Sequence, residues 1–187
     1  MKKIICFLMA TVMCLAMTAC GEGTASSSKA SSSVAVSSSS APVSSASQAK
    51  YYFKDNILVE EDVKIEIEKY KIIQPGEKGN KDSENPIIAF WYKTTNLSGK
   101  EKISPMAAWI PMFEAIQDND PNKINTLSIA ELPDDQFLQS QIQEIKKGGT
   151  VENAIAYVLS DTTTPVTLKA TIGIGGEKLG EQNYNLK

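Results

Sequence analysis

Short segments in which apolar and polar residues alternate are the feature that most restricts the fold of this chain. Val63, Ile65 and Ile67 alternate with charged residues, as in a β-strand with one buried face. The apolar pattern resumes at Tyr70 with a change of phase, which predicts a β-bulge between Ile67 and Tyr70. The acidic run at 60–62 before this strand is expected to be a solvated turn.

Further strands are expected along the rest of the chain. Residues 87–95 are apolar on both faces, which is typical of a central strand. Residues 107–117 also favour a strand, but Pro111 lacks a backbone N–H, so we expect this strand at a sheet edge or broken at Pro111. The glycines of 173–176 predict a hairpin turn. Two strands whose connection suits a hairpin or a sandwich corner, and a last strand, are predicted at 151–159, 166–172 and 182–186.

Residues 135–146 allow two interpretations. Asp134 suits the cap of a short helix in which Leu138, Ile142 and Ile145 share one face. Three glutamines at every second position also suit the polar face of a strand. We favour the strand for the second half of the segment.

Seven or eight short strands in about 138 residues, separated by turn signals, favour an all-β fold, an antiparallel β-sandwich. A chain of that length suits one domain with an ordinary hydrophobic core. Trp91 lies in the most apolar strand and is expected in this core. Trp109 has two interpretations: it belongs to the core, or it forms an exposed contact surface with Met112 and Phe113.

The N-terminus resembles an export signal. Lys2 and Lys3 precede an uncharged apolar run, 4–17, which is too short to cross a bilayer comfortably, and small residues lead into Cys20. The arrangement resembles the lipobox of bacterial lipoproteins, with Met17 where leucine is usual. This resemblance implies cleavage before Cys20 and attachment of lipid to its thiol. Ordinary secretion with a free thiol is the alternative.

The serine-rich stretch that follows cannot bury enough apolar surface to fold, so we expect a disordered linker with a mean span of about 30 Å. Because Cys6 and Cys14 would leave with the signal, the mature chain keeps only Cys20 and forms no intramolecular disulfide. The predicted parts are a signal peptide at 1–19, the lipidated cysteine and linker at 20–49, and a folded domain at 50–187.

Composition excludes several classes of function. All 19 basic residues are lysines, and the formal net charge is −3 at pH 7, which is a poor match for nucleic acid. The chain has no histidine, so histidine-dependent nucleophiles and the usual zinc and copper sites are excluded. Chemistry that uses carboxylates alone, as in a glycosidase, remains open. No cofactor is expected.

One motif has the spacing of a calcium loop. Asp118, Asp120 and Asn122 occupy the first, third and fifth positions. Lys123 stands where the loop needs glycine, and Ile129 stands where it needs a bidentate glutamate. A plain turn is therefore the favoured interpretation, with a weak calcium site as the alternative.

Strand and turn phrases at 90–96, 113–119, 147–150, 156–159 and 164–166 form a pattern within residues 51–175. This pattern resembles a family of Gram-positive bacterial lipoproteins with a C-terminal immunoglobulin-like domain of unknown function. Gly148 and Gly149 stand where relatives often have a Pro-Gly turn. The resemblance implies an immunoglobulin-like sandwich of about 7–8 strands and an extracytoplasmic location. It implies no reaction and no functional residue.

We favour a non-enzymatic binding or interaction module, held at the outer face of the cell membrane by lipid on Cys20, with a protein or cell-wall ligand. Its contact surface is expected within 106–113 or in the adjacent loop 117–127, where apolar residues and prolines coincide without a strand pattern. The alternatives are a carboxylate-based cell-wall hydrolase and a passive envelope accessory protein without a ligand. The sequence leaves the ligand and the oligomeric state open.

Overall fold

The computed structural model describes residues 50–100 and 102–187. The predicted signal peptide, the predicted linker and Cys20 lie outside the described residues. Among the described helices, none is long and apolar enough to cross a membrane.

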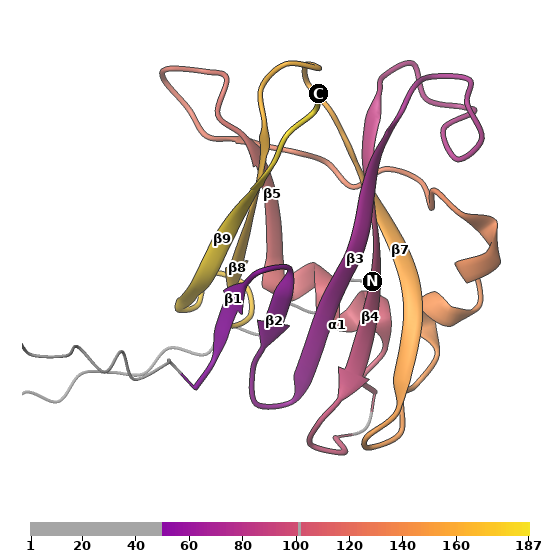
Figure 1. Ribbon diagram of the computed structural model, residues 1–187, viewed down its shortest axis with the longest axis vertical. Helices are drawn as coiled ribbons and strands as arrows, with labels where there is room; N and C mark the ends of the chain where they lie inside the picture. Colours follow the sequence, from indigo (N-terminus) through magenta and orange to yellow (C-terminus); the bar gives the residue numbers. More distant parts are fainter. Residues whose placement is uncertain (1–49, 101) are drawn as a thin grey trace, which may run out of the picture. The chain divides into compact units, whose positions relative to one another are not determined.

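Two antiparallel sheets pack face to face and make the domain an all-β sandwich (Figure 1). The first sheet has the strand order β1-β2-β3-β4-β7, and the second has the order β6-β5-β8-β9. The strands of the first sheet are β1 (Tyr52–Lys54), β2 (Ile57–Val59), β3 (Val63–Ile73), β4 (Ile87–Asn96) and β7 (Thr150–Val158). Those of the second are β5 (Phe113–Gln117), β6 (Asn125–Thr126), β8 (Val166–Thr171) and β9 (Lys178–Tyr184).

The order of pairing follows the immunoglobulin pattern. With β3, β4 and β7 taken as strands A, B and E, the strands β5, β8 and β9 fall in the places of C, F and G. The short β6 pairs with β5, as strand C′ does in variable-type domains. Because β7 and β8 belong to different sheets, the connection 160–165 is a sandwich corner and not a hairpin.

The predicted half-buried and central strands are confirmed. The register of β3 on β4 shifts between Ile67 and Lys69, where the change of phase in the sequence predicted a bulge. Strand β4 lies between β3 and β7, as its two apolar faces indicated. The last strand, β9, begins four residues earlier than the sequence pattern suggested.

The hairpin β1–β2 was not predicted, and it closes one side of the sandwich. Asp55 and Asn56 form its turn with φ of 52° and 65°, a conformation that Asp and Asn tolerate better than most residues. The Asn56 side chain then meets β9, because its Oδ1 accepts hydrogen bonds from Gln182 and Tyr184. The hairpin therefore bridges β3 of one sheet and β9 of the other.

The expected strand 107–117 is wrong in its first half, which forms helix α1 (Pro105–Met112). Ser104 is the N-cap, and its Oγ accepts a hydrogen bond from the Ala107 N–H at 3.4 Å. Pro105 follows at the first helical position, where the missing N–H costs nothing. Pro111 sits in the last turn, so the helix ends there and the chain continues as β5.

The strand favoured for the second half of 135–146 is also wrong. The segment contains two 3₁₀ turns, η1 (Asp135–Phe137) and η2 (Ser140–Ile142). Asp134 caps the first turn, as the helical interpretation suggested. Both turns pack along β7, and the Ser140 hydroxyl donates to the Glu152 carbonyl at 3.0 Å. The segment thus covers an edge of β7 that would otherwise be open to another strand.

Candidate functional site

Trp109 belongs to the core. The indole is completely buried, its ring centre lies 4.3 Å from that of Tyr92 and 4.4 Å from that of Phe113, and its Nε1–H donates to the Tyr157 hydroxyl at 2.7 Å. Phe113 is also buried, whereas Met112 is only half-buried. The proposed contact surface is therefore wrong for Trp109 and Phe113, because α1 turns both rings inward between the sheets.

Trp91 does not belong to the main core, contrary to expectation. It lies on the outer face of the first sheet and is half-buried beside the small cluster of Ile73, Ile87, Ala89 and Ala156. The Lys69 ammonium lies 4.7 Å above the indole ring, and Nε1–H donates to Asp134 at 3.3 Å.

The calcium interpretation gains no support from the geometry. The Asp120 carboxylate accepts a hydrogen bond from the Asn122 N–H at 2.9 Å and lies 3.7 Å from the Lys123 ammonium. Asp118 is exposed. Within the described residues, no group of three or more Asp, Glu, His or Cys side chains could hold a metal ion. The segment is a turn, which was the favoured interpretation.

The sandwich corner 160–165 is held by a polar network that the sequence did not reveal. Gln117 is completely buried, and its side-chain amide bonds to the Ser160 N–H and to the carbonyls of Asp161 and Thr164. Hydrogen bonds from the Thr164 N–H, the Asn119 side chain and the Thr163 N–H hold the pKa of Asp161 far below its usual range. The network fixes the sandwich corner to the end of β5.

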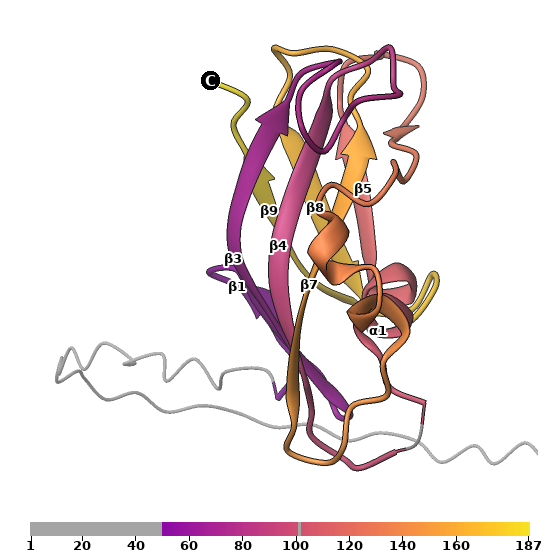
Figure 2. The same cartoon turned by 90° about the vertical axis from the view of Figure 1, so that its right-hand side faces the viewer.

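Hollows lie at both ends of the sandwich. We call the end that carries α1 the helix end. It also holds the β2–β3 turn, the connection 97–104, and the turns that precede β7 and follow β8, because β3 starts opposite the end of β4 and β5 starts opposite the end of β8. The opposite end, which we call the loop end, holds the β3–β4 loop, the corner 160–165 and the C-terminus (Figures 1 and 2).

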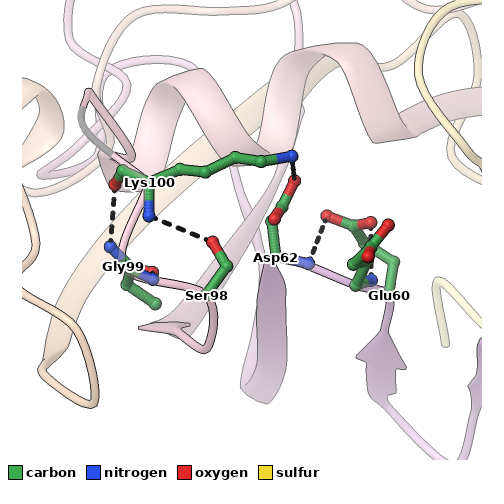
Figure 3. Close-up of polar contacts among 7 residues, drawn as sticks. Glu60, Asp62, Ser98, Gly99 and Lys100 are labelled. Atoms are coloured by element: carbon green, nitrogen blue, oxygen red, sulfur yellow. Dashed lines mark hydrogen bonds and ion pairs between the residues drawn. The ribbon is translucent and has the colours of Figure 1, made fainter.

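The hollow at the helix end has a volume of about 180 Å³ and is lined by Glu60, Asp62, Lys100 and Met112 among others. Figure 3 shows Lys100 reaching the Asp62 carboxylate, at 2.6 Å, while the Glu60 carboxylate folds back onto the backbone N–H groups of Glu61 and Asp62. The predicted acidic turn therefore exists, but Glu60 is only 8% exposed.

The Asp62–Lys100 ion pair keeps both groups charged. The hydrogen bond from Lys100 lowers the pKa of Asp62, and the same bond raises the pKa of Lys100. One carboxylate oxygen of Asp62 is buried and has no hydrogen-bond partner among the described residues. The charges of Asp62 and Lys100 are thus used within the fold.

The loop end carries a larger groove. It has a volume of about 400 Å³ and lies between the β3–β4 loop and the segment 131–135. A second hollow of about 230 Å³, with Ile87, Ile129 and Val158 in its walls, shares Gly79, Asp82 and Glu131 with the first. We call the combined hollow the loop-end groove. Its charged lining includes Lys78, Lys81, Asp82, Glu131 and Asp135.

Backbone contacts fix both walls of the loop-end groove. The buried Asn80 donates to the carbonyls of Ile73 and Asn85, at 3.1 and 2.9 Å, and so holds the β3–β4 loop. On the other wall, the Ala130 N–H donates to β7 at 2.8 Å. Gly79 lets the walls meet, since an added Cβ would come within 2.3 Å of the Pro133 carbonyl oxygen. The groove is therefore preorganised.

Sequence analysis missed this groove because its lining comes mainly from two segments, 78–82 and 131–135, that are about fifty positions apart. Neither segment has the pattern of a strand or a helix. A buried Asn inside a polar loop leaves no distinctive signal. Of the predicted contact residues, Trp109, Met112 and Phe113 lie at the helix end or in the core. The predicted loop 117–127 lies at the loop end, but none of its residues lines the groove.

The resolved pKa shifts point away from acid–base chemistry. Asp62 and Asp161 have lowered pKa values, and Lys93 and Lys100 have raised ones, so all four stay charged near neutral pH. Burial raises the pKa of Tyr157 to about 12. A general acid or base is normally shifted toward the working pH.

The sequence model of a family described as Domain of unknown function (DUF5067) matches residues 38–171. The chain belongs to this family. The DUF5067 chain resembles a solved structure of a "putative lipoprotein" from Staphylococcus aureus subsp. aureus NCTC 8325, with a TM-score of 0.62 and 20% sequence identity. The match covers 73% of this chain and 92% of the staphylococcal chain. At this identity the likeness shows the fold. No curated protein sequence matches the chain.

Proposed function

We propose that the protein is an extracytoplasmic lipoprotein whose sandwich binds a protein or cell-wall ligand without catalysing a reaction. The preorganised loop-end groove carries this proposal. Its lysines and carboxylates offer both signs of charge beside apolar side chains of the wall, which suits a peptide-like or wall-derived segment.

The anchor rests on the lipobox before Cys20 and agrees with the description of the staphylococcal structure. Lipid on Cys20 would hold the mature chain at the outer face of the membrane, and residues 20–49 would serve as its tether. Replacing Cys20 with Ala should release the protein from the membrane fraction or leave an unprocessed precursor. Mature, membrane-bound C20A protein would contradict the anchor.

A carboxylate-based hydrolase is disfavoured. None of the resolved pKa shifts in the described residues creates a carboxylic acid that stays protonated near neutral pH, as a glycosidase acid does.

Sedimentation with purified cell walls tests the binding role. A double variant, Lys78→Glu with Lys81→Glu, reverses the cationic side of the groove, and Lys146→Glu with Lys147→Glu makes the same charge change at the helix end. We expect wild-type protein and the helix-end variant to sediment with walls or with a wall-associated protein, and the groove variant to stay in solution. Equal behaviour of all three proteins would contradict the groove as the binding surface.

A further inference from the structure

The turn between β8 and β9 exposes an isoleucine at its tip. Ile174 is 90% exposed, and its neighbours Gly173 and Gly175 have φ of 63° and 70°. The turn is closed internally, because the Ile172 N–H donates to the Glu177 carbonyl at 2.9 Å and the Thr171 hydroxyl donates to the Gly173 carbonyl at 2.7 Å. A fixed backbone therefore holds an apolar side chain in water, where turns usually carry polar residues.

Other exposed apolar side chains gather at the same end. Of the ten large hydrophobic residues that are exposed in the described part of the chain, five belong to the helix end. They are Tyr52, Leu97, Ile110, Ile172 and Ile174. Figures 1 and 2 both show α1 and the β8–β9 turn at this end of the sandwich.

The described part of the chain begins at the helix end. Tyr52, the first residue of β1, pairs with Val59, and the chain then turns at 60–62 into the start of β3. Strand β1 lies against β9 near the β8–β9 turn, since a Cβ added to Gly180 would come within 2.1 Å of the Phe53 carbonyl oxygen. Twenty-nine residues separate Cys20 from Lys50, so a lipid on Cys20 would hold this end near the bilayer.

Exposed lysines also lie at the helix end. Lys102, Lys146 and Lys147 are exposed at the helix end and make no ion pair within the described residues. The chain as a whole is acidic. Glu61, Glu144 and Glu177 are also exposed at this end, so the attraction of an anionic bilayer would act on Lys146 and Lys147, which are adjacent in the chain, and not on the whole end.

We propose that the helix end docks onto an anionic lipid bilayer, with Ile174 inserted at the interface and Lys146 and Lys147 near the headgroups. This inference rests on the lipid anchor of the proposed function. It leaves the loop-end groove facing away from the membrane, open to ligands of the cell wall.

Site-specific labelling of the full lipidated protein tests the orientation. The mature chain contains no cysteine except Cys20, whose thiol is blocked by lipid, so Ile174→Cys adds a single reactive thiol for an environment-sensitive fluorophore. Ile124→Cys is the matched control, because Ile124 is 74% exposed in the loop between β5 and β6, at the loop end. Both proteins are reconstituted into vesicles of phosphatidylcholine with phosphatidylglycerol.

We expect the label at position 174 to shift its emission to shorter wavelengths and to be quenched several-fold more strongly by bilayer-embedded nitroxide lipids than the label at position 124. Lys146→Glu with Lys147→Glu should reduce that quenching, as should vesicles of phosphatidylcholine alone. A shift at position 174 that appears without vesicles would indicate contact with a second copy and overturn the proposal.

The two proposals fail in different ways. Protein that does not float with the vesicles contradicts the lipid anchor and, with it, the docking. Protein that floats while both labels remain equally exposed to water overturns the docking alone and leaves the anchor intact.

Discussion

The two tryptophans lie against opposite faces of strand β4 and differ in burial. On the inner face, Trp109 from α1 packs against Tyr92 and donates to Tyr157, and none of the indole is exposed. On the outer face, Trp91 lies beneath the Lys69 ammonium and reaches Asp134 with its N–H. The second sheet covers the inner face, whereas the outer face has only a crossing loop. Burial therefore depends on what lies opposite a side chain.

Of the substitutions that test this comparison, loss of the Trp109 indole should have the largest effect on the free energy of unfolding. Trp109→Ala should lower the free energy of unfolding by about 3–5 kcal/mol, because a large cavity forms between aromatic rings and the Tyr157 hydroxyl loses its partner. Urea unfolding measures the change. A loss below about 1 kcal/mol would show that the inner face repacks without Trp109.

Alkaline pH should lower the free energy of unfolding through ionisation of Tyr157, which lies on the inner face. Burial raises the pKa of Tyr157 to about 12 from an ordinary value of 10.0, so the neutral hydroxyl contributes stability that is complete below pH 10. That contribution, about 2–3 kcal/mol, should be lost as the pH rises from 10 to 12. Unfolding of Tyr157→Phe protein should depend less steeply on pH in this range. An unchanged slope would contradict burial of the hydroxyl.

A smaller effect is expected from the hydrogen bond alone. Near neutral pH, Tyr157→Phe leaves the buried Trp109 N–H without its acceptor and should cost about 1–3 kcal/mol. Fluorescence-detected unfolding in a Trp91→Phe background isolates the emission of Trp109. Full stability of the Tyr157→Phe protein would show that the indole finds another acceptor.

Truncation of Trp91 on the outer face should lower the free energy of unfolding least. Trp91→Ala removes the contact with Lys69 and the bond to Asp134, both at the surface, and should cost only about 1 kcal/mol. High salt should narrow the difference from wild type, because the Lys69 contact is electrostatic. A cost as large as that of Trp109→Ala would erase the distinction between the two faces.

The strand pattern predicted much of the fold because alternation is a local property of one segment. Val63, Ile65 and Ile67 mark a strand with one buried face wherever the rest of the chain lies, and the change of phase before Tyr70 required a bulge. The hairpin β1–β2 was missed because each strand has only three residues, too few for a clear period.

The candidate site was less predictable. Ser104 and Pro105 form a helix start that was present in the sequence, but the apolar residues after them suit a strand equally well. The loop-end groove depends on Asn80 and on the pairing of Ala130 with β7, contacts between segments that lie far apart in the chain. A pattern of residues within one segment does not indicate which distant segments that segment will contact.

By itself, the sequence determined most of the longer β-strands, the absence of histidine and of arginine, and the lipobox-like run before Cys20, because composition and short periods do not depend on folding. The tertiary structure decided which tryptophan is buried, that 105–112 is helical, and where a groove forms. Those properties arise only when two sheets meet and distant loops come together, since burial and cavities are made by the elements on both sides.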